Sequence, residues 1–175
     1  SMWSPQTRKL IWSKRVHRDQ VRSLNFSPDG RRILSASCDG TALVLRTVNG
    51  EQEQIIQKSG DELTAAYFTA EHDEVITASI AGDVAVWRKA EPMEQIIAKH
   101  SFWVLALSFL RDFNLAISGG YDAVLKVIDM ETGYAYEGGR VNEGPIIAVA
   151  CSNDQRTLIV TTYDKSAFVL DIVIN

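Results

Sequence analysis

The sequence predicts an all-β fold built from four consecutive repeat units, and two regularities predict it. Polar turns begin at positions 39, 81, 122 and 164, with spacings of 42, 41 and 42 residues. A second landmark stands 22 residues before each turn, at His17, Ser59, His100 and Asn142. An offset that is kept through four units indicates one structural element repeated along the chain.

Each unit holds short alternating apolar runs in a constant order, separated by Gly, Asp and Asn turns. The expected first strands cover 21–26, 63–68, 104–109 and 146–151, the second strands 32–37, 74–79, 114–119 and 156–162, and the third strands 42–45, 84–87, 125–128 and 167–170. Weaker fourth strands are expected at 52–57, 93–98 and 134–137, and their polar residues suit an outer edge. Such runs form antiparallel meanders, and four-stranded units at this period are the blades of a β-propeller.

Composition places the chain among ordinary globular proteins. Its 175 residues are 46% hydrophobic and 23% charged, with a net charge of −4. The mild negative charge argues against binding driven by nucleic-acid phosphates, and no apolar run has the roughly 18 residues needed to cross a membrane. We expect an intracellular protein, cytoplasmic or nuclear, with no membrane contact.

The first unit closely resembles a WD repeat. It carries His17, then Val21, then Phe26-Ser27-Pro28-Asp29-Gly30, and later Ser35-Ala36-Ser37-Cys38-Asp39-Gly40-Thr41. The resemblance extends over nearly the whole chain. It implies a propeller in which a His, a Ser or Thr, an Asp and a Trp of one blade form a buried hydrogen-bond relay.

The resemblance assigns relay positions that no unit fills completely. The residues implied are His17, Ser37 and Asp39 in the first unit, His100, Ser118 and Asp122 in the third, and Asp164 in the fourth. Leu45 and Ile128 stand at the Trp position of the first and third units, whereas the second unit keeps Trp87 without the His and the Asp. Incomplete relays predict blades that are individually less rigid.

The fourth unit offers three strands, and a candidate strand within residues 8–15 stands where a preceding unit would have its outer strand. We therefore expect residues 1–7 to be an expression remnant and tail, and 8–175 to form one propeller domain with repeats at about 16–57, 58–98, 99–140 and 141–175. The last blade would be closed by the N-terminal strand, as WD-type rings typically close. The closure remains open between a two-chain, eight-bladed homodimer, a self-closed four-bladed ring, and a half-ring completed by another protein or by further sequence.

The sequence offers no recognisable catalytic, cofactor or metal site. Cys38 and Cys151 lack the spacing of a metal site or a disulfide framework. The repeat-equivalent places of His17 and His100 predict a structural role, and His72 lies in a polar turn. We expect a protein that is not an enzyme.

Binding in such folds uses the loops at one face of the ring. Aromatic candidates there are Phe102, Trp103, Tyr121 and Tyr163, and acidic candidates are Asp19, Asp61 and Glu62. Rigid aromatic side chains make strong contact points, although Trp103 could instead pack between blades, and the carboxylates favour a basic peptide. The leading hypothesis is a scaffold that binds peptides or domains of a larger complex. The alternative is an assembly element that dimerises through its open blade edges, and a nucleic-acid-associated scaffold is a distant third.

Overall fold

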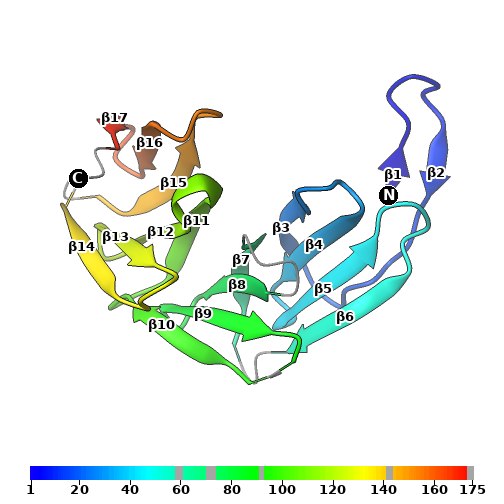
Figure 1. The fold of residues 1–175 in the computed structure, drawn as a ribbon, viewed down its shortest axis with the longest axis horizontal. Helices are drawn as coiled ribbons and strands as arrows, with labels where there is room; N and C mark the ends of the chain where they lie inside the picture. The colour runs from blue at the N-terminus through cyan, green and yellow to red at the C-terminus, as the bar shows by residue number, and fades with distance from the viewer. Residues whose placement is uncertain (58–60, 70–73, 91–92, 141–143, 173–175) are drawn as a thin grey trace.

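The computed structural model describes residues 1–57, 61–69, 74–90, 93–140 and 144–172 (Figure 1). Ser59, His72 and Asn142 lie outside the described residues. These described residues form seventeen strands and one short 3-10 helix. The structure confirms the all-β fold and its four-stranded antiparallel units.

Three four-stranded blades and one three-stranded blade contain fifteen of these strands. Blade 1 holds β3 (Val21–Phe26), β4 (Arg32–Ser37), β5 (Thr41–Arg46) and β6 (Gln52–Gln57). Blade 2 holds β7 (Leu63–Phe68), β8 (Glu74–Ser79), β9 (Asp83–Arg88) and β10 (Gln95–Lys99). Blade 3 holds β11 (Val104–Leu110), β12 (Leu115–Gly120), β13 (Val124–Asp129) and β14 (Ala135–Arg140), and blade 4 holds β15 (Ile146–Cys151), β16 (Thr157–Thr162) and β17 (Ala167–Asp171).

The predicted strands differ from the observed ones mainly at their ends. The helix η1 (Arg111–Phe113) separates β11 from β12, and Asn114 caps it in the left-handed region at φ 51°. The second strand of blade 3 therefore begins at Leu115, one residue later than predicted. The outer strands β10 and β14 also extend further towards the C-terminus than their polar sequences suggested.

The blades form an open arc with the strands β3, β7, β11 and β15 on its concave side (Figure 1). The N-terminal strand β2 (Leu10–Trp12) pairs with β1 (Met2–Trp3) in a hairpin, and this hairpin stands apart from β17 at the other end of the arc. The expected closure of the last blade by residues 8–15, and a self-closed four-bladed ring, are therefore absent from the described part of this chain. The arc is left open between blade 4 and blade 1, so the four blades do not close into a ring by themselves (Figure 1).

The core lies between successive blades. We call the surface of a blade that meets the next blade its forward face, and the opposite surface its backward face. Between blades 1 and 2, forward residues such as Leu34 and Val44 pack on backward residues such as Phe68 and Trp87. Two similar clusters join blade 2 to blade 3 and blade 3 to blade 4. Because alternate residues of a strand point to opposite faces, each central strand of blades 2 and 3 contributes to two of these layers.

The turn between the second and third strands of every blade requires one residue with positive φ. Gly40 (79°), Gly82 (88°), Ala123 (61°) and Lys165 (71°) occupy this position. A Cβ atom on Gly82 would lie 2.5 Å from the His100 carbonyl oxygen, so this glycine is required for space as well as conformation. Ala123 and Lys165 adopt a backbone conformation that glycine adopts without steric cost.

Replacing Lys165 by Gly should therefore stabilise the protein by up to about 1 kcal/mol, because the left-handed strain disappears and the exposed side chain gives up no buried surface. Chemical denaturation measures this change. Lys165→Ala is the matched control, since it removes the same side chain and keeps the strain. Equal stability of the two variants would contradict the interpretation.

Candidate functional site

A buried histidine relay fixes the loops at one end of blade 1. His17 Nδ1 lies 3.1 Å from Asp39 Oδ2 and 3.0 Å from Thr41 Oγ1, and His17 Nε2 lies 2.7 Å from Ser35 Oγ. The backbone amide of Arg18 also donates to Asp39 Oδ2, at 2.8 Å. The relay thus joins the loop before β3 to the turn before β5.

The serine that contacts His17 is Ser35. The prediction of Ser37 at this place is wrong by two residues along β4. Both hydroxyls lie on the same face of β4, since they are two residues apart. Ser37 stands at the strand end, where its hydroxyl donates to the Asp19 carbonyl and accepts from the Asp39 amide. The imidazole extends further into the blade and reaches Ser35.

Blade 3 repeats the relay with the expected residues. His100 Nε2 lies 2.8 Å from Ser118 Oγ, and His100 Nδ1 lies 3.0 Å from Asp122 Oδ1. Burial raises the pKa of the Asp122 carboxyl, but hydrogen bonds from His100 and from the Ser101 and Val124 amides outweigh it, so the pKa falls below its usual value. The pKa of Asp39 is lowered in the same way, with Thr41 as the main donor.

Blades 2 and 4 retain only parts of the relay. In blade 2, Trp87 Nε1 donates to Thr77 Oγ1 at 2.8 Å, and Thr77 stands at the repeat position of Ser35 and Ser118. The buried hydroxyl of Ser79 finds no hydrogen-bond partner among the described residues. In blade 4, Thr162 donates to Asp164. The second blade therefore carries a buried polar group that the relay leaves unsatisfied.

Two serine substitutions compare the stability effect of a buried hydroxyl that has a hydrogen-bond partner with that of one that has none among the described residues. Ser118→Ala should lower the free energy of unfolding by about 1–3 kcal/mol, because buried His100 Nε2 loses its partner. Ser79→Ala should be neutral or stabilising by up to about 1 kcal/mol, because its buried hydroxyl has no partner to lose. Urea denaturation of both variants gives the comparison, and equal losses would contradict it.

The depressed pKa of Asp122 predicts a pH-dependent contribution to stability. The carboxylate stabilises the folded state above its unfolded pKa of about 3.9, and this stabilisation is lost as the pH falls towards the folded value. Asp122→Asn should therefore cost about 1–3 kcal/mol at pH 7, and its difference from the unmodified protein should shrink below about pH 4. Unfolding curves across this range measure it. The exposed Asp112→Asn is the control, and a difference that does not change with pH would refute the assignment.

One backbone hydrogen bond, repeated in every blade, brings together the two groups of loops that form the candidate binding face. The amides that donate and the carbonyls that accept are Cys38 to Gln20 at 2.9 Å, Ile80 to Glu62 at 3.1 Å, Tyr121 to Trp103 at 2.8 Å, and Tyr163 to Pro145 at 2.9 Å. The residue before each turn is thereby held beside the residues that open the first strand. These loops form what we call the loop face.

The structure brings Trp103 and Tyr121 together on blade 3. Their ring centroids are 5.9 Å apart with an interplanar angle of 58°, and the two residues are 52% and 51% exposed. Phe102 and Tyr163 are exposed as well, although Tyr163 belongs to the next blade. Trp103 is therefore not packed away between blades. Trp103 and Tyr121 form an accessible aromatic pair, and a hydrogen bond joins their backbones.

The acidic candidates lie near a backbone donor and a positive charge that the sequence did not predict. Asp61 and Glu62 are half-buried, and Asp61 Oδ2 accepts from the Ala81 amide at 3.3 Å. Arg22 donates to Cys38 Sγ at 3.0 Å, and this bond, followed by the charges of Cys38, Glu62 and Asp19, raises the pKa of its guanidinium. Arg22 thus lies close enough to Glu62 and Asp19 to offset part of their charge.

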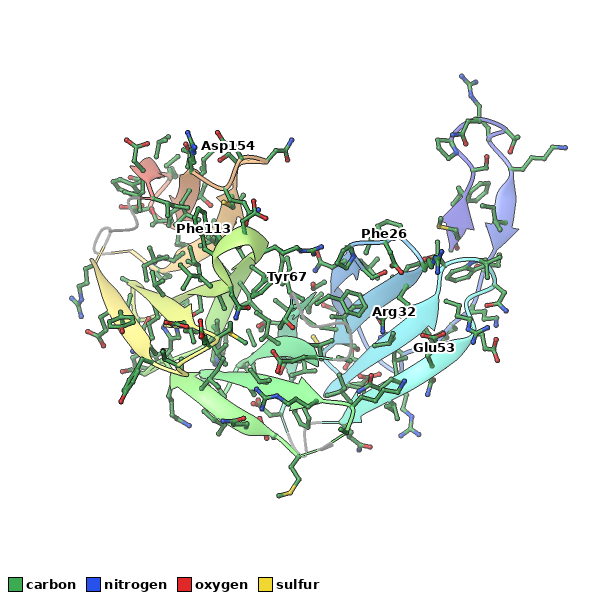
Figure 2. All side chains as sticks on the ribbon, viewed as in Figure 1. Phe26, Arg32, Glu53, Tyr67, Phe113 and Asp154 are labelled. Carbon is green, nitrogen blue, oxygen red and sulfur yellow. The ribbon has the colours of Figure 1, made fainter. Side chains whose placement is uncertain are left out.

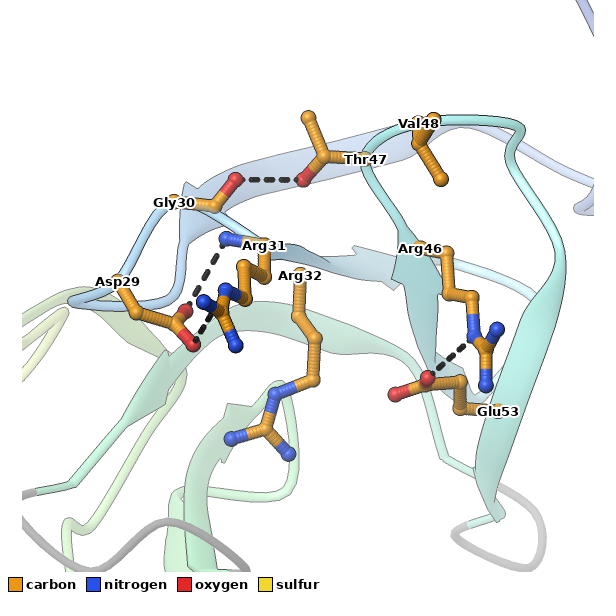
Figure 3. A pocket seen from close by; sticks show the side chains of 8 residues that line it. All are labelled: Asp29, Gly30, Arg31, Arg32, Arg46, Thr47, Val48 and Glu53. Atoms are coloured by element: carbon orange, nitrogen blue, oxygen red, sulfur yellow. Dashed lines mark hydrogen bonds and ion pairs between the residues drawn. The ribbon is translucent and has the colours of Figure 1, made fainter.

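A separate hollow of about 780 Å³ lies on blade 1, at the turns opposite the loop face (Figure 3). Arg46 Nε contacts Glu53 at 2.7 Å, and Arg31 and Asp29 form a looser pair at 4.0 Å. Sequence reasoning missed this hollow, and the neighbouring arginines Arg31 and Arg32 were its only signal. The hollow therefore contains ion pairs between residues that line it, Arg46 with Glu53 and Arg31 with Asp29.

The described ranges contain no group of three or more His, Cys, Asp or Glu side chains able to hold a metal ion. None of the helices found there has the length and apolar character required to cross a membrane.

Repeated antiparallel blades with histidine relays in blades 1 and 3 define a β-propeller array, and comparisons with known proteins agree. The family model for the WD domain, G-beta repeat, matches residues 8–44 and 93–129. The nuclear distribution protein nudF of Aspergillus flavus is 27% identical over 75% of this chain and 30% of its own length. The mitotic checkpoint protein bub3 of Dictyostelium discoideum is 22% identical over 87% of this chain and 46% of its own length.

Solved structures share the arc of blades. The β-propeller domain of Myceliophteria thermophila Cps50 (Swd1) superposes with a TM-score of 0.84 over 98% of this chain and 58% of that chain, at 18% identity. The computationally designed Ika4 protein superposes with a TM-score of 0.78 over 94% of this chain and 99% of that chain. The chain has the fold of a β-propeller and is similar in sequence to WD-repeat proteins, and it spans less than half the length of these two curated relatives.

Proposed function

We propose that this chain is a protein-interaction scaffold that binds peptides or domains of a larger complex through its loop face. The observation that carries the proposal is the exposed Trp103–Tyr121 pair. Large aromatic side chains supply much contact area and lose little conformational entropy on binding, so they dominate many interfaces. Members of the WD-repeat family generally serve as scaffolds for protein complexes, and we assign no catalytic role.

The framework beneath the pair favours binding without a large rearrangement. The Tyr121 amide donates to the Trp103 carbonyl, and the buried His100–Asp122 contact fixes the loop next to them. Less entropy is lost when a partner meets side chains whose backbone is already ordered. The relay therefore acts as a support for the binding loops and need not touch the partner.

A peptide with Lys or Arg side chains fits this face better than an acidic one. A cation can lie over the electron-rich face of Trp103, and Glu62 and Asp19 add negative charge on the same face. The relatives are named a nuclear distribution protein and a mitotic checkpoint protein, which supports a role inside the cell, in the cytoplasm or the nucleus. The net charge of −4 leaves nucleic acid as a distant alternative.

The second candidate function is assembly through the ends of the arc. The observation that favours it is exposed apolar surface on the two end blades, including Leu24 on blade 1 and Val169 on blade 4. In this function the main role of the protein is to join chains through its two end blades, and binding at the loop face is secondary.

Peptide binding to Trp103 tests the leading proposal. On an array of basic peptides and matched acidic ones, the unmodified chain should retain basic peptides, and Trp103→Ala should weaken that binding by tenfold or more. Tyr136→Ala is the control, because Tyr136 is equally exposed on the outer strand β14. Equal effects of the two variants, or a preference for acidic peptides, would contradict the proposal.

The charge contribution has its own test. Glu62→Lys should weaken binding of the retained basic peptides several-fold, and the loss should shrink at high salt because exposed charges are screened. Fluorescence titration at two salt concentrations measures this. Glu131→Lys, on a turn away from the loop face, is the control. Unchanged affinity in Glu62→Lys would remove the basic partner from the proposal.

A further inference from the structure

The forward face of blade 4 exposes positions that the other blades bury wholly or in part. Ile159 is 46% exposed, whereas its repeat equivalent Ile117 is 3% exposed. Val169 is 68% exposed, and its equivalent Val86 is 1% exposed. Ala148, Ala150 and Ala167 complete this face, and each is exposed. Blade 4 therefore keeps the apolar surface of an internal blade although no blade of this chain covers it.

The backward face of blade 1 shows the same property at the other end of the arc. Leu24 is 66% exposed where its equivalent Ala66 is fully buried, and Phe26 is 57% exposed where Phe68 is 5% exposed. Figure 2 shows Phe26 at the uncovered side of this blade. Only the inner part of the face is open, because Ile33, Leu43 and Leu45 further out are buried.

The forward face of blade 4 and the backward face of blade 1 correspond to the two sides of the interface between neighbouring blades. The chain contains three such interfaces among its described residues. A forward face packs on a backward face between blades 1 and 2, 2 and 3, and 3 and 4. We propose that a second copy of this chain supplies the missing half at both ends, so that blade 4 of each copy packs on blade 1 of the other. This inference rests on the second candidate function and is independent of the loop face.

The internal contacts predict which residues meet between the copies. Asn25 Nδ2 donates to the Ala66 carbonyl between blades 1 and 2, and the equivalent pair is Ala150 with Leu24. The guanidinium of Arg32 lies over the Phe68 ring at 5.2 Å, and the equivalent pair is Thr157 with Phe26. The new contact pairs small or short side chains of blade 4 with large apolar ones of blade 1.

The curvature of the arc fits a ring of more than four blades, and a second copy of the chain would supply the further blades. The chain superposes on 58% of a β-propeller domain, so its blades turn as they do in a ring with more than four. Eight blades close with about 45° per blade, and two four-bladed arcs related by a two-fold axis leave no face uncovered. Closure by symmetry explains why both faces can stay apolar without causing open-ended association.

The N-terminal segment lies where it could complete the blade of the second copy. Trp12 Nε1 donates to the Thr47 carbonyl at 2.8 Å and Lys14 Nζ to the Gly50 carbonyl at 3.2 Å, which holds this segment beside blade 1. Among the described strands none pairs with the outer edge of β17. The residues around β2 of one copy can therefore become the fourth strand of blade 4 in the other.

Solution mass with face-directed variants tests the proposal. Light scattering on a size-exclusion column should give about twice the chain mass of 19.5 kDa across a concentration series. Val169→Asp and Leu24→Asp should each reduce the mass to that of one chain while circular dichroism stays unchanged, since both side chains are exposed in a single chain. Ile96→Asp is the control, because Ile96 is also an exposed apolar residue but lies on the outer strand β10.

A disulfide test checks the register. Chains carrying Ala150→Cys are mixed with chains carrying Leu24→Cys and oxidised, and a disulfide-linked dimer should appear only in the mixture. Each single variant alone is the control for the native cysteines Cys38 and Cys151.

Each other outcome overturns the pairing in a distinct way. A single-chain mass at all concentrations would mean that other sequence or another protein covers these faces. A dimer that survives both Asp substitutions would keep the assembly function but use a different surface. Masses that grow with concentration beyond two chains would exclude closure by a two-fold axis.

Discussion

The packing of the forward face of one blade on the backward face of the next is the interaction on which the whole structure depends. A single sheet of this size cannot bury both of its apolar faces alone, so each blade needs a neighbour on either side. Residues such as Ile76 on β8 are fully buried only because blade 3 lies against them. The same requirement leaves the forward face of blade 4 and the inner part of the backward face of blade 1 uncovered, and the stability of the ends depends on what covers these surfaces.

The relay has a different task from this packing. It connects the loop before the first strand with the turn before the third, and it exists in full histidine form in blades 1 and 3, where His17 and His100 are buried. Blade 2 uses Trp87 and Thr77, and blade 4 retains Thr162 and Asp164. Loops are thus fixed most firmly at alternate blades. The exposed Trp103–Tyr121 pair belongs to blade 3, which has one of the two histidine relays.

Repeat spacing and strand alternation predicted much of this fold because they are local properties of the sequence. Five of the six relay residues assigned in blades 1 and 3 make the expected contacts. The exception is Ser37, because Ser35 and Ser37 share one face of β4 and only the reach of the His17 ring distinguishes them. The N-terminal hairpin could not be foreseen, since Met2–Trp3 carries almost no pattern. Likewise, Arg22 belongs to blade 1 and Glu62 to blade 2. The sequence of neither strand indicates that the two charges lie near each other.

The central claim is that one blade-to-blade interface, repeated within the chain, also operates between two copies of it. A crystal structure of the purified chain tests this most directly. The account predicts an eight-bladed ring around a two-fold axis, with Ala150 of one copy against Leu24 of the other. Arcs whose end faces contact solvent, or copies joined through the outer strands β6, β10 and β14, would contradict it.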